Sequence, residues 1–405
     1  MDGDVANSAP VIPEHVPAHL VRDVDVFNLP GADADVHLAW RRLQQEGPEI
    51  FWTPRNGGHW IATRAEDIEA FQLDHEHFSM AALSIPKTDA STPAIPISLD
   101  PPRHWPFRKL MQPAFLPRAV DRLEEGVRAT AIRLIDGLAP LGRCEFVGDF
   151  ATRLPITVFM EMMDLPVDDM ERLRPLADTA TRSPDVAERR KASGAMAQYV
   201  MGYVRQRRET PGDDLISFVG RGEVEGRPIS FEETLSMVVL LMFGGLDTVA
   251  SMLGFVARFL AENPAHRRQL IEDPSIIPNA VEELIRRHGL VNTARLVVDD
   301  YHYKGVFLRK GDQMQLPNGL VGLDERRFDD PLTVDFRRER PIKHAAFGNG
   351  PHTCPGAILA RRELKVFLEE WLKRIPDFQI EPGQSPRFAV GMVNTVTVLP
   401  LVWTA

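Results

Sequence analysis

The segment from Met237 to Leu260, MVVLLMFGGLDTVASMLGFVARFL, limits what this chain can fold into more than any other stretch. It is long and apolar enough to cross a bilayer as a helix. However, Asp247 falls at its middle and Arg258 near its end, and a charge at the centre of a bilayer is energetically costly. The segment therefore predicts a helix buried inside a large soluble domain, and we expect no membrane partner.

The bulk composition is typical of a soluble globular protein, with 44% hydrophobic and 26% charged residues. The 57 acidic and 47 basic residues give a net charge of −10, which argues weakly against nucleic acid as a partner. The two cysteines, Cys144 and Cys354, cannot build a disulfide framework, so we expect a cytoplasmic protein. The first residues are rich in acids and prolines and predict no signal peptide.

Helical periodicity dominates residues 103–290, whereas short strands are expected within 295–316 and 387–402. Ser230 and Glu233 form a capping-box pattern, which predicts one continuous helix ending before Pro264. Nearer the N-terminus we expect an irregular lead-in over 1–36, a hairpin at Asn56-Gly57-Gly58 and a long functional loop over 79–99. The expected fold is mainly α with a minor β region, in a single domain over 1–405.

Cys354 lies in a loop of glycines and prolines, FGNGPHTCPG, which is followed by a helical pattern. A thiolate is a strong metal ligand, and the N-terminus of the following helix would stabilise its negative charge. An isolated cysteine is more often a small buried hydrophobic residue. A zinc site is disfavoured because no second cysteine is near, and no base stands out for a Cys-His nucleophile.

Gly244-Gly245-Leu246-Asp247-Thr248 interrupts the long apolar segment. Glycine within a helix is about 1 kcal/mol less favourable than alanine, and a buried carboxylate needs a partner. One interpretation is a helix crossing that needs small residues, with Asp247 paired to a base. The other is that the glycines open space over a cofactor while Thr248 holds a polar ligand or water and Asp247 relays protons.

Together these motifs resemble the cytochrome P450 family. The loop matches its haem-binding signature, Phe-x-x-Gly-x-x-x-Cys-x-Gly, at Phe347, Gly350, Cys354 and Gly356, and Gly244 to Thr248 match its oxygen-activation motif. Further stretches, such as HAAFGNGPHTC and LARRELKVFLEEWLKRIPDFQIEPG, look like the bacterial camphor-hydroxylase family. The resemblance implies a triangular helical prism whose long central helix lies over haem b, with a thiolate that favours O–O cleavage.

The resemblance also implies residue roles. Cys354 would be the axial iron ligand, and Asp247 and Thr248 would deliver protons. The haem would further be held by Phe347, Gly356, Gly244 and four candidate propionate partners, His104, Arg108, Arg295 and His352. A buried structural set is expected at Glu283, Arg286 and Arg338.

The substrate assignment departs from the camphor hydroxylases, which bind their substrate's ketone with a tyrosine hydroxyl in the long loop. No tyrosine lies in 79–99, and the equivalent position is Thr92. We expect Phe243 to narrow the pocket and Met392 and Val393 to line it, together with Leu240 and Val291. A small apolar terpenoid or norisoprenoid is therefore expected, and camphor hydroxylase, peroxygenase, haem sensor and a haem-free helical scaffold stay as alternatives.

The expected oxidant is O2, and the expected electron donor is a [2Fe–2S] ferredoxin with an NADH-dependent reductase. Basic residues just after the cysteine loop, Arg361, Arg362 and Lys365, predict a docking patch for an acidic ferredoxin, which Arg108 and Lys109 would extend. We expect the protein to act as a monomer.

Overall fold

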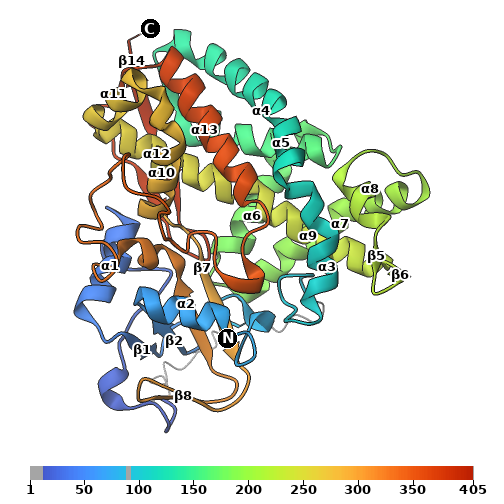
Figure 1. Ribbon diagram of the computed structural model, residues 1–405, viewed down its shortest axis with the longest axis vertical. Helices are drawn as coiled ribbons and strands as arrows, with labels where there is room; N and C mark the ends of the chain where they lie inside the picture. Colours follow the sequence, from blue (N-terminus) through green and yellow to red (C-terminus); the bar gives the residue numbers. More distant parts are fainter. Residues whose placement is uncertain (1–11, 88–92, 405) are drawn as a thin grey trace, which may run out of the picture.

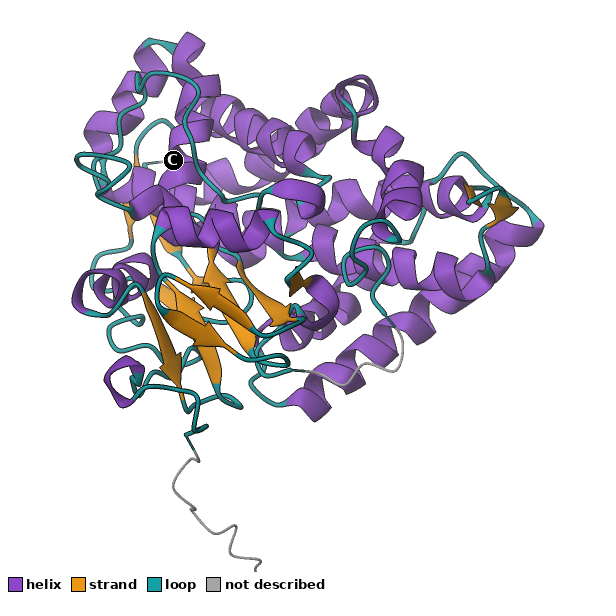
Figure 2. Ribbon diagram, turned by 60° about the horizontal axis from the view of Figure 1, so that its bottom comes forward, coloured by secondary structure: helices purple, strands orange, loops and turns teal. Residues whose placement is uncertain are grey.

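The computed structural model describes residues 12–87 and 93–404. Helices fill most of the molecule, and strands gather at one corner (Figure 2). The helices are α1 Val36–Glu46, α2 Ala65–Leu73, α3 His104–Met111, α4 Pro117–Leu138, α5 Arg153–Met162, α6 Met170–Arg182, α7 Val186–Glu209, α8 Leu215–Gly220, α9 Phe231–Leu246, α10 Thr248–Glu262, α11 Pro264–Glu272, α12 Ile277–Arg287 and α13 Ala357–Arg374.

The strands are short. They are β1 Ile50–Thr53, β2 His59–Ala62, β3 Phe78–Ser79, β4 Arg143–Glu145, β5 Glu223–Val224, β6 Arg227–Pro228, β7 Asn292–Val297, β8 Tyr301–Tyr303, β9 Val306–Leu308, β10 Gln313–Pro317, β11 Phe378–Ile380, β12 Arg387–Ala389, β13 Thr395–Val398 and β14 Pro400–Trp403. The largest sheet has the order β1-β2-β10-β7-β3. The expected hairpin is confirmed, because β1 and β2 pair antiparallel around Asn56, Gly57 and Gly58, which all have positive φ.

The helix boundaries follow local capping chemistry. Asp35 caps α1 by accepting hydrogen bonds from the amides of His37 and Leu38, and α1 ends before Gly47. The predicted capping box is confirmed at the start of α9, where Ser230 and Glu233 each bond the other's backbone amide. These caps satisfy backbone donors that a buried helix end would otherwise leave unpaired.

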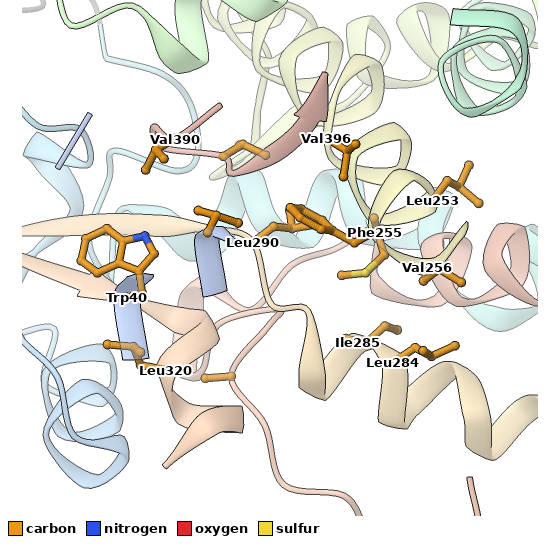
Figure 3. Close-up of a cluster of buried hydrophobic side chains, with 14 of the residues drawn as sticks. Trp40, Leu253, Phe255, Val256, Leu284, Ile285, Leu290, Leu320, Val390 and Val396 are labelled. Atoms are coloured by element: carbon orange, nitrogen blue, oxygen red, sulfur yellow. The ribbon is translucent and has the colours of Figure 1, made fainter. Parts of the chain in front are cut away.

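The core surrounds α10, which crosses the middle of the molecule between α12 and the C-terminal strands (Figures 1 and 3). Leu253 and Val256 of α10 are fully buried, and the same cluster includes Leu284 and Ile285 of α12. α13 packs against both α4 and α12. The body is thereby organised around one apolar helix, and α13, which follows the cysteine loop, also packs against it.

The prediction of one continuous helix from Ser230 to Pro264 is wrong. α9 ends at Leu246 and α10 begins at Thr248, because Asp247 leaves the helical conformation at φ −127° and ψ −43°. The Thr248 hydroxyl donates to the Gly244 carbonyl at 2.9 Å and so competes for the acceptor that helical bonding would use. Gly245 has no room for a side chain, since a Cβ there would overlap the Phe159 ring.

The apolar segment is buried inside the molecule, as the sequence predicts, although it forms two helices. Over Phe231–Glu262 the chain is long and apolar enough to span a membrane, yet 67% of its most apolar window is buried inside the molecule. Burial against other helices, rather than contact with lipid, accounts for its composition.

Candidate active site

A cavity of about 320 Å³, called the main cavity below, lies between the α9–α10 junction and the cysteine loop. β7 contributes to its wall, α3 closes one side, and the loop before α3 adds Met80, Pro96 and Ile97. The loop predicted over 79–99 thus covers the main cavity with its described residues. Thr92 lies outside the described residues.

The cysteine loop is folded by its glycines. Gly348 and Gly350 adopt φ values of 69° and 70°, which are favourable mainly for glycine. The Cys354 amide donates to the Phe347 carbonyl at 2.8 Å, and this bond closes the loop. Cys354 is reached by solvent because its sulfur faces the main cavity, although protein surrounds it on the other sides.

The electrostatics at Cys354 are balanced between burial and positive groups. Burial raises the pKa of the Cys354 thiol, whereas hydrogen bonds from the Gly356 and Ala357 amides and the charges of Arg108 and Arg361 lower it. The two amides lie at the start of α13, where the helix dipole also favours negative charge. The loop is therefore built to hold a negatively charged sulfur once a cation neutralises it.

Four basic side chains line the main cavity without a carboxylate within 3.5 Å in the described part of the chain: His104, Arg108, Arg295 and His352. Arg295 is 3% exposed, and its guanidinium donates only to Thr293 and the Ala294 carbonyl. The Nδ1 atoms of His104 and His352 and the Nε2 of His352 have no hydrogen-bond partner. Such unpartnered buried nitrogens predict an anionic ligand.

Burial depresses the pKa values of these groups when no anion is present. The pKa of His104 falls to about 4 and that of His352 to about 3, with nearby positive charges adding to the effect of burial. Burial also lowers the pKa of Arg295 to about 10. A buried anion beside them would reverse these shifts, because it would favour the charged forms.

Comparison with known proteins identifies the family. The family model for cytochrome P450 matches residues 173–391. A probable cytochrome P450 127A1 from Sinorhizobium fredii is 36% identical over 97% of this chain and 97% of its own. This chain belongs to the cytochrome P450 family. The mycinamicin IV hydroxylase/epoxidase of Micromonospora griseorubida is 32% identical, over 91% of this chain and 97% of its own.

Two solved structures of P450s superpose on nearly the whole chain. Cytochrome P450 CYP101C1 is 41% identical and CYP101J2 is 40% identical. Both alignments cover 98% of this chain and 100% of the other, each with a TM-score of 0.90. The mainly helical P450 fold predicted from the sequence is confirmed. P450s are oxidoreductases of the monooxygenase class, and proteins of this family bind haem b.

The donor set of this P450 fits a haem. The main cavity offers one thiol held by backbone amides, four basic groups with no carboxylate within 3.5 Å among the described residues for two propionates, and an apolar wall for the porphyrin. Gly244 has open space where a Cβ would be, and it faces the same cavity. Phe347, which the sequence places against the sulfur, lies in the wall together with Gly356.

Asp247 and Thr248 open onto different cavities of this P450. Thr248 lines the main cavity, whereas Asp247 lines a second cavity of about 470 Å³, called the side cavity below. The Asp247 carboxylate accepts hydrogen bonds from Arg182 and from the hydroxyls of Thr181 and Ser251. The interpretation that Asp247 is paired with a base is confirmed, and both interpretations of the motif prove compatible.

The predicted buried set is brought together below the cysteine loop. Arg286 donates to both oxygens of Glu283 at 2.8 Å, and Arg338 donates to Glu283 at 2.9 Å. Glu283 and Arg286 are fully buried. Removing one partner would strand a buried charge, which typically costs about 3–5 kcal/mol.

The expected pocket residues separate into two groups. Leu240 and Val291 line the main cavity. Phe243 is not among the residues that line the main cavity and packs against a core cluster that includes residues of α7 and α8. Val393 is buried in the core and bridges to Val291, and Met392 makes backbone bonds to Thr181 and Asn292. The structure thus does not bring Phe243, Met392 and Val393 into the wall of the main cavity, and their role toward substrate stays a prediction.

The expected basic patch after the cysteine loop is also corrected. Acidic side chains pair with each of its residues. Arg361 pairs with Glu282, Arg362 with Asp121 and Glu124, and Lys365 with Glu124 and Glu369. Arg361 also stacks on the Phe347 ring at 4.5 Å. Helical spacing places the cations on one side of α13. The α4 acids Asp121 and Glu124 lie on the neighbouring helix and compensate their charge.

Glu363 is a cavity residue that the sequence analysis missed. It is 2% exposed, lines the main cavity and has no hydrogen-bond partner among the described side chains and backbone groups. Burial raises its pKa to about 8, so it is mainly protonated at neutral pH. The spacing offered a signal, because Glu363 lies four residues from both Leu359 and Phe367 on the buried face of α13.

Glu363 predicts a distinct pH dependence of stability. Its folded-state pKa lies above its unfolded value of 4.5, so its contribution is present below pH 4.5 and is lost as pH rises through about 8. Between pH 4.5 and about pH 8, Glu363 should lower the free energy of unfolding by about 1.4 kcal/mol for each pH unit. Urea unfolding of the holoprotein from pH 5 to pH 8 should show this slope, and Glu363→Gln should remove it. An exposed control, Glu209→Gln, should keep it, and an unchanged slope in Glu363→Gln would contradict the assignment.

Proposed function

We propose that this P450 is a ferredoxin-dependent monooxygenase that hydroxylates a small apolar terpenoid or norisoprenoid. The observation that carries the proposal is the α9–α10 junction, where Thr248 faces an apolar cavity and Asp247 faces a polar one. Bound haem would supply the activation of O2, with Cys354 as its axial ligand. The rest of the chemistry falls to the residues of this chain.

Binding of the cofactor would use the basic groups of the main cavity. Arg295 and Arg108, with His104 and His352, are arranged to neutralise two propionates, because charge-assisted hydrogen bonds are strong in a buried site. Phe347 would keep water from the sulfur. The set Glu283, Arg286 and Arg338 would hold the scaffold beneath the loop.

Protons would reach the main cavity across the helix break. Asp247 is held by Arg182, which also donates to Asp178 at 2.6 Å, so the carboxylate has a fixed orientation in the side cavity. The Thr248 hydroxyl donates to the Gly244 carbonyl, which leaves its oxygen free to accept a hydrogen bond from a water in the main cavity. Asp247 would exchange protons with the side cavity, and Thr248 would hold that water in place.

The partners follow from the resemblance to the camphor hydroxylases. We propose O2 as oxidant and a [2Fe–2S] ferredoxin, reduced by an NADH-dependent reductase, as electron donor. We also propose that the chain acts as one domain and as a monomer in the cytoplasm. A peroxygenase or a haem sensor would have no use for a paired acid and alcohol at the oxygen site, so Asp247 and Thr248 favour the monooxygenase.

Replacing Thr248 tests the proton path. Thr248→Ala should keep substrate binding and NADH consumption in the reconstituted system, but should divert most of the reducing equivalents to peroxide. Thr248→Ser keeps the hydroxyl and should restore coupling. The measurement is the ratio of product and of peroxide to NADH consumed, and an unchanged product ratio in Thr248→Ala would contradict the role of Thr248 in the proton path.

The shape and chemistry of the main cavity favour an apolar substrate. Its distal wall is built from aliphatic and aromatic side chains, among them Leu240, Leu241, Val249, Val291 and Phe115. None of the tyrosines lines the wall formed by the described residues. Gln72 and Asn318 are polar, but the Gln72 amide donates to the Asn318 oxygen and accepts from Asn349, so these atoms are already engaged by protein groups. Camphor would therefore lose the donor that its ketone uses in the camphor hydroxylases.

Ligand titration tests this substrate class. Losing one neutral hydrogen bond typically costs about 0.5–1.5 kcal/mol, or about tenfold in affinity at the upper end. We expect an ionone-like enone to bind about tenfold tighter than camphor and to convert more haem from low to high spin. The measurement is the optical spin shift of the ferric holoprotein. Tighter binding and a larger shift with camphor would favour the camphor-hydroxylase alternative.

A further inference from the structure

We infer that three amide side chains, Asn349, Gln72 and Asn318, form a chain of hydrogen bonds that positions the cysteine loop, and that Gln72 is the positioning residue at its centre. The inference goes beyond the proposed function, because it concerns how Cys354 is fixed and depends neither on the substrate nor on the electron donor. It is carried by the end of α2, which packs against the cysteine loop (Figure 1).

The cysteine loop is closed by hydrogen bonds between its own residues. The Cys354 amide donates to the Phe347 carbonyl at 2.8 Å, and the Thr353 hydroxyl donates to the Gly350 carbonyl at 2.8 Å. These bonds give the loop its shape, but they do not fix it relative to α2 or to the main sheet. Among the described residues, Asn349 makes the one side-chain hydrogen bond that joins this loop to another element.

Asn349 needs such a partner because both of its neighbours are glycines. Gly348 and Gly350 have positive φ, and the backbone of glycine is conformationally permissive. Nδ2 of Asn349 donates to Oε1 of Gln72 at 2.8 Å. The backbone of α2 is also close, since a Cβ on Gly350 would lie 3.1 Å from the carbonyl oxygen of Gln72. Gln72 therefore meets the loop with both its side chain and its backbone.

Gln72 connects the loop to the main sheet. Its Nε2 donates to Oδ1 of Asn318 at 2.8 Å. Asn318 directly follows β10, and its backbone amide donates to the Val291 carbonyl at 3.0 Å, just before β7 begins. β7 pairs with β10 and carries Arg295, the buried guanidinium of the main cavity. The chain of amides thus links the loop that holds the thiol to the strand that holds a candidate propionate partner.

Burial makes these hydrogen bonds effective restraints. Gln72 is 1% exposed and Asn318 is 3% exposed. A buried polar group that loses its partner typically costs about 1–3 kcal/mol, so a displaced loop would leave amide groups unsatisfied. Amide side chains carry no charge, so they restrain the loop without adding a charge beside the Cys354 sulfur.

The position of the loop relative to β7 is a requirement of the cofactor. Haem is a rigid ligand, and its iron must meet the Cys354 sulfur while its propionates meet the basic groups on β7 and α3. Both contacts can form together only if the loop and β7 keep a fixed separation. Gln72 lies between the two and acts through Asn349 and Asn318, which makes it a positioning residue rather than a catalytic one.

Gln72→Met tests the inference, because it keeps a side chain of similar length but removes both hydrogen bonds. In the reduced, CO-bound holoprotein in mild urea, the thiolate band should convert to the band of thiolate-free haem about tenfold faster than in the wild type. Hydrogen exchange of the loop peptide in the ferric holoprotein should also become faster. Gln72→Glu can still accept from Asn349 and should recover part of the wild-type behaviour.

A second variant keeps the test decisive if Gln72→Met does not fold. Asn349→Ala separates the loop from α2 but leaves the bond between Gln72 and Asn318 in place, and it should accelerate the conversion of the thiolate band in the same way. The matched control is Gln44→Met. Gln44 is fully buried and donates to the carbonyls of Thr63 and Leu320, but it does not contact the cysteine loop.

The variants are compared at urea concentrations at which their free energies of unfolding are equal. Gln44→Met should then keep the wild-type conversion and exchange rates. Wild-type rates in both Gln72→Met and Asn349→Ala would overturn the inference, and so would an equal acceleration in Gln44→Met, which would indicate a general loss of stability. Faster conversion in Gln72→Met together with tighter binding of camphor than of the enone would leave the inference in place and contradict the proposed substrate class.

Discussion

The break in the central helix at Asp247 is the constraint on which the arrangement of the site depends. Even in a regular helix, Asp247 and Thr248 would point about 100° apart, and the Gly244 carbonyl would accept the hydrogen bond of the Thr248 amide. In this structure the Thr248 hydroxyl also donates a hydrogen bond to the Gly244 carbonyl, and the Asp247 carboxylate accepts one from Arg182. The backbone at this point separates the apolar main cavity from the polar side cavity. Thr248 lines the main cavity, and its neighbour Asp247 lines the side cavity.

The second constraint is the accumulation of basic groups around a buried thiol. Arg295 and two histidines are buried with Asp100, 4.0 Å from His352, as their nearby carboxylate, and the depressed pKa values of the three basic groups express the unfavourable burial. An anionic ligand that contains iron would neutralise the basic groups with its negative charges and the Cys354 thiolate with its iron. The site is therefore organised for its cofactor in advance, so binding requires little rearrangement of the groups that hold it.

Sequence reasoning predicted features that depend on local spacing. The hairpin at Gly57, the capping box at Ser230, the cysteine loop and the basic groups around it are short patterns whose chemistry is visible in the chain. It did not predict the pairing of Arg362 with acids of α4, or the packing of Phe243 against a core cluster outside the main cavity, because both depend on tertiary packing. Glu363 was missed since an acid between basic residues resembles a solvated helix face.

The central claim is that Cys354 is the thiolate ligand of a haem, and the absorption spectrum of the reduced, CO-bound holoprotein tests it most directly. The account predicts the red-shifted band that thiolate-ligated haem gives, present in Cys144→Ala and lost in Cys354→Ala at a haem content measured in the same samples. A wild-type holoprotein without this band, or a Cys354→Ala protein that retains it, would contradict the account.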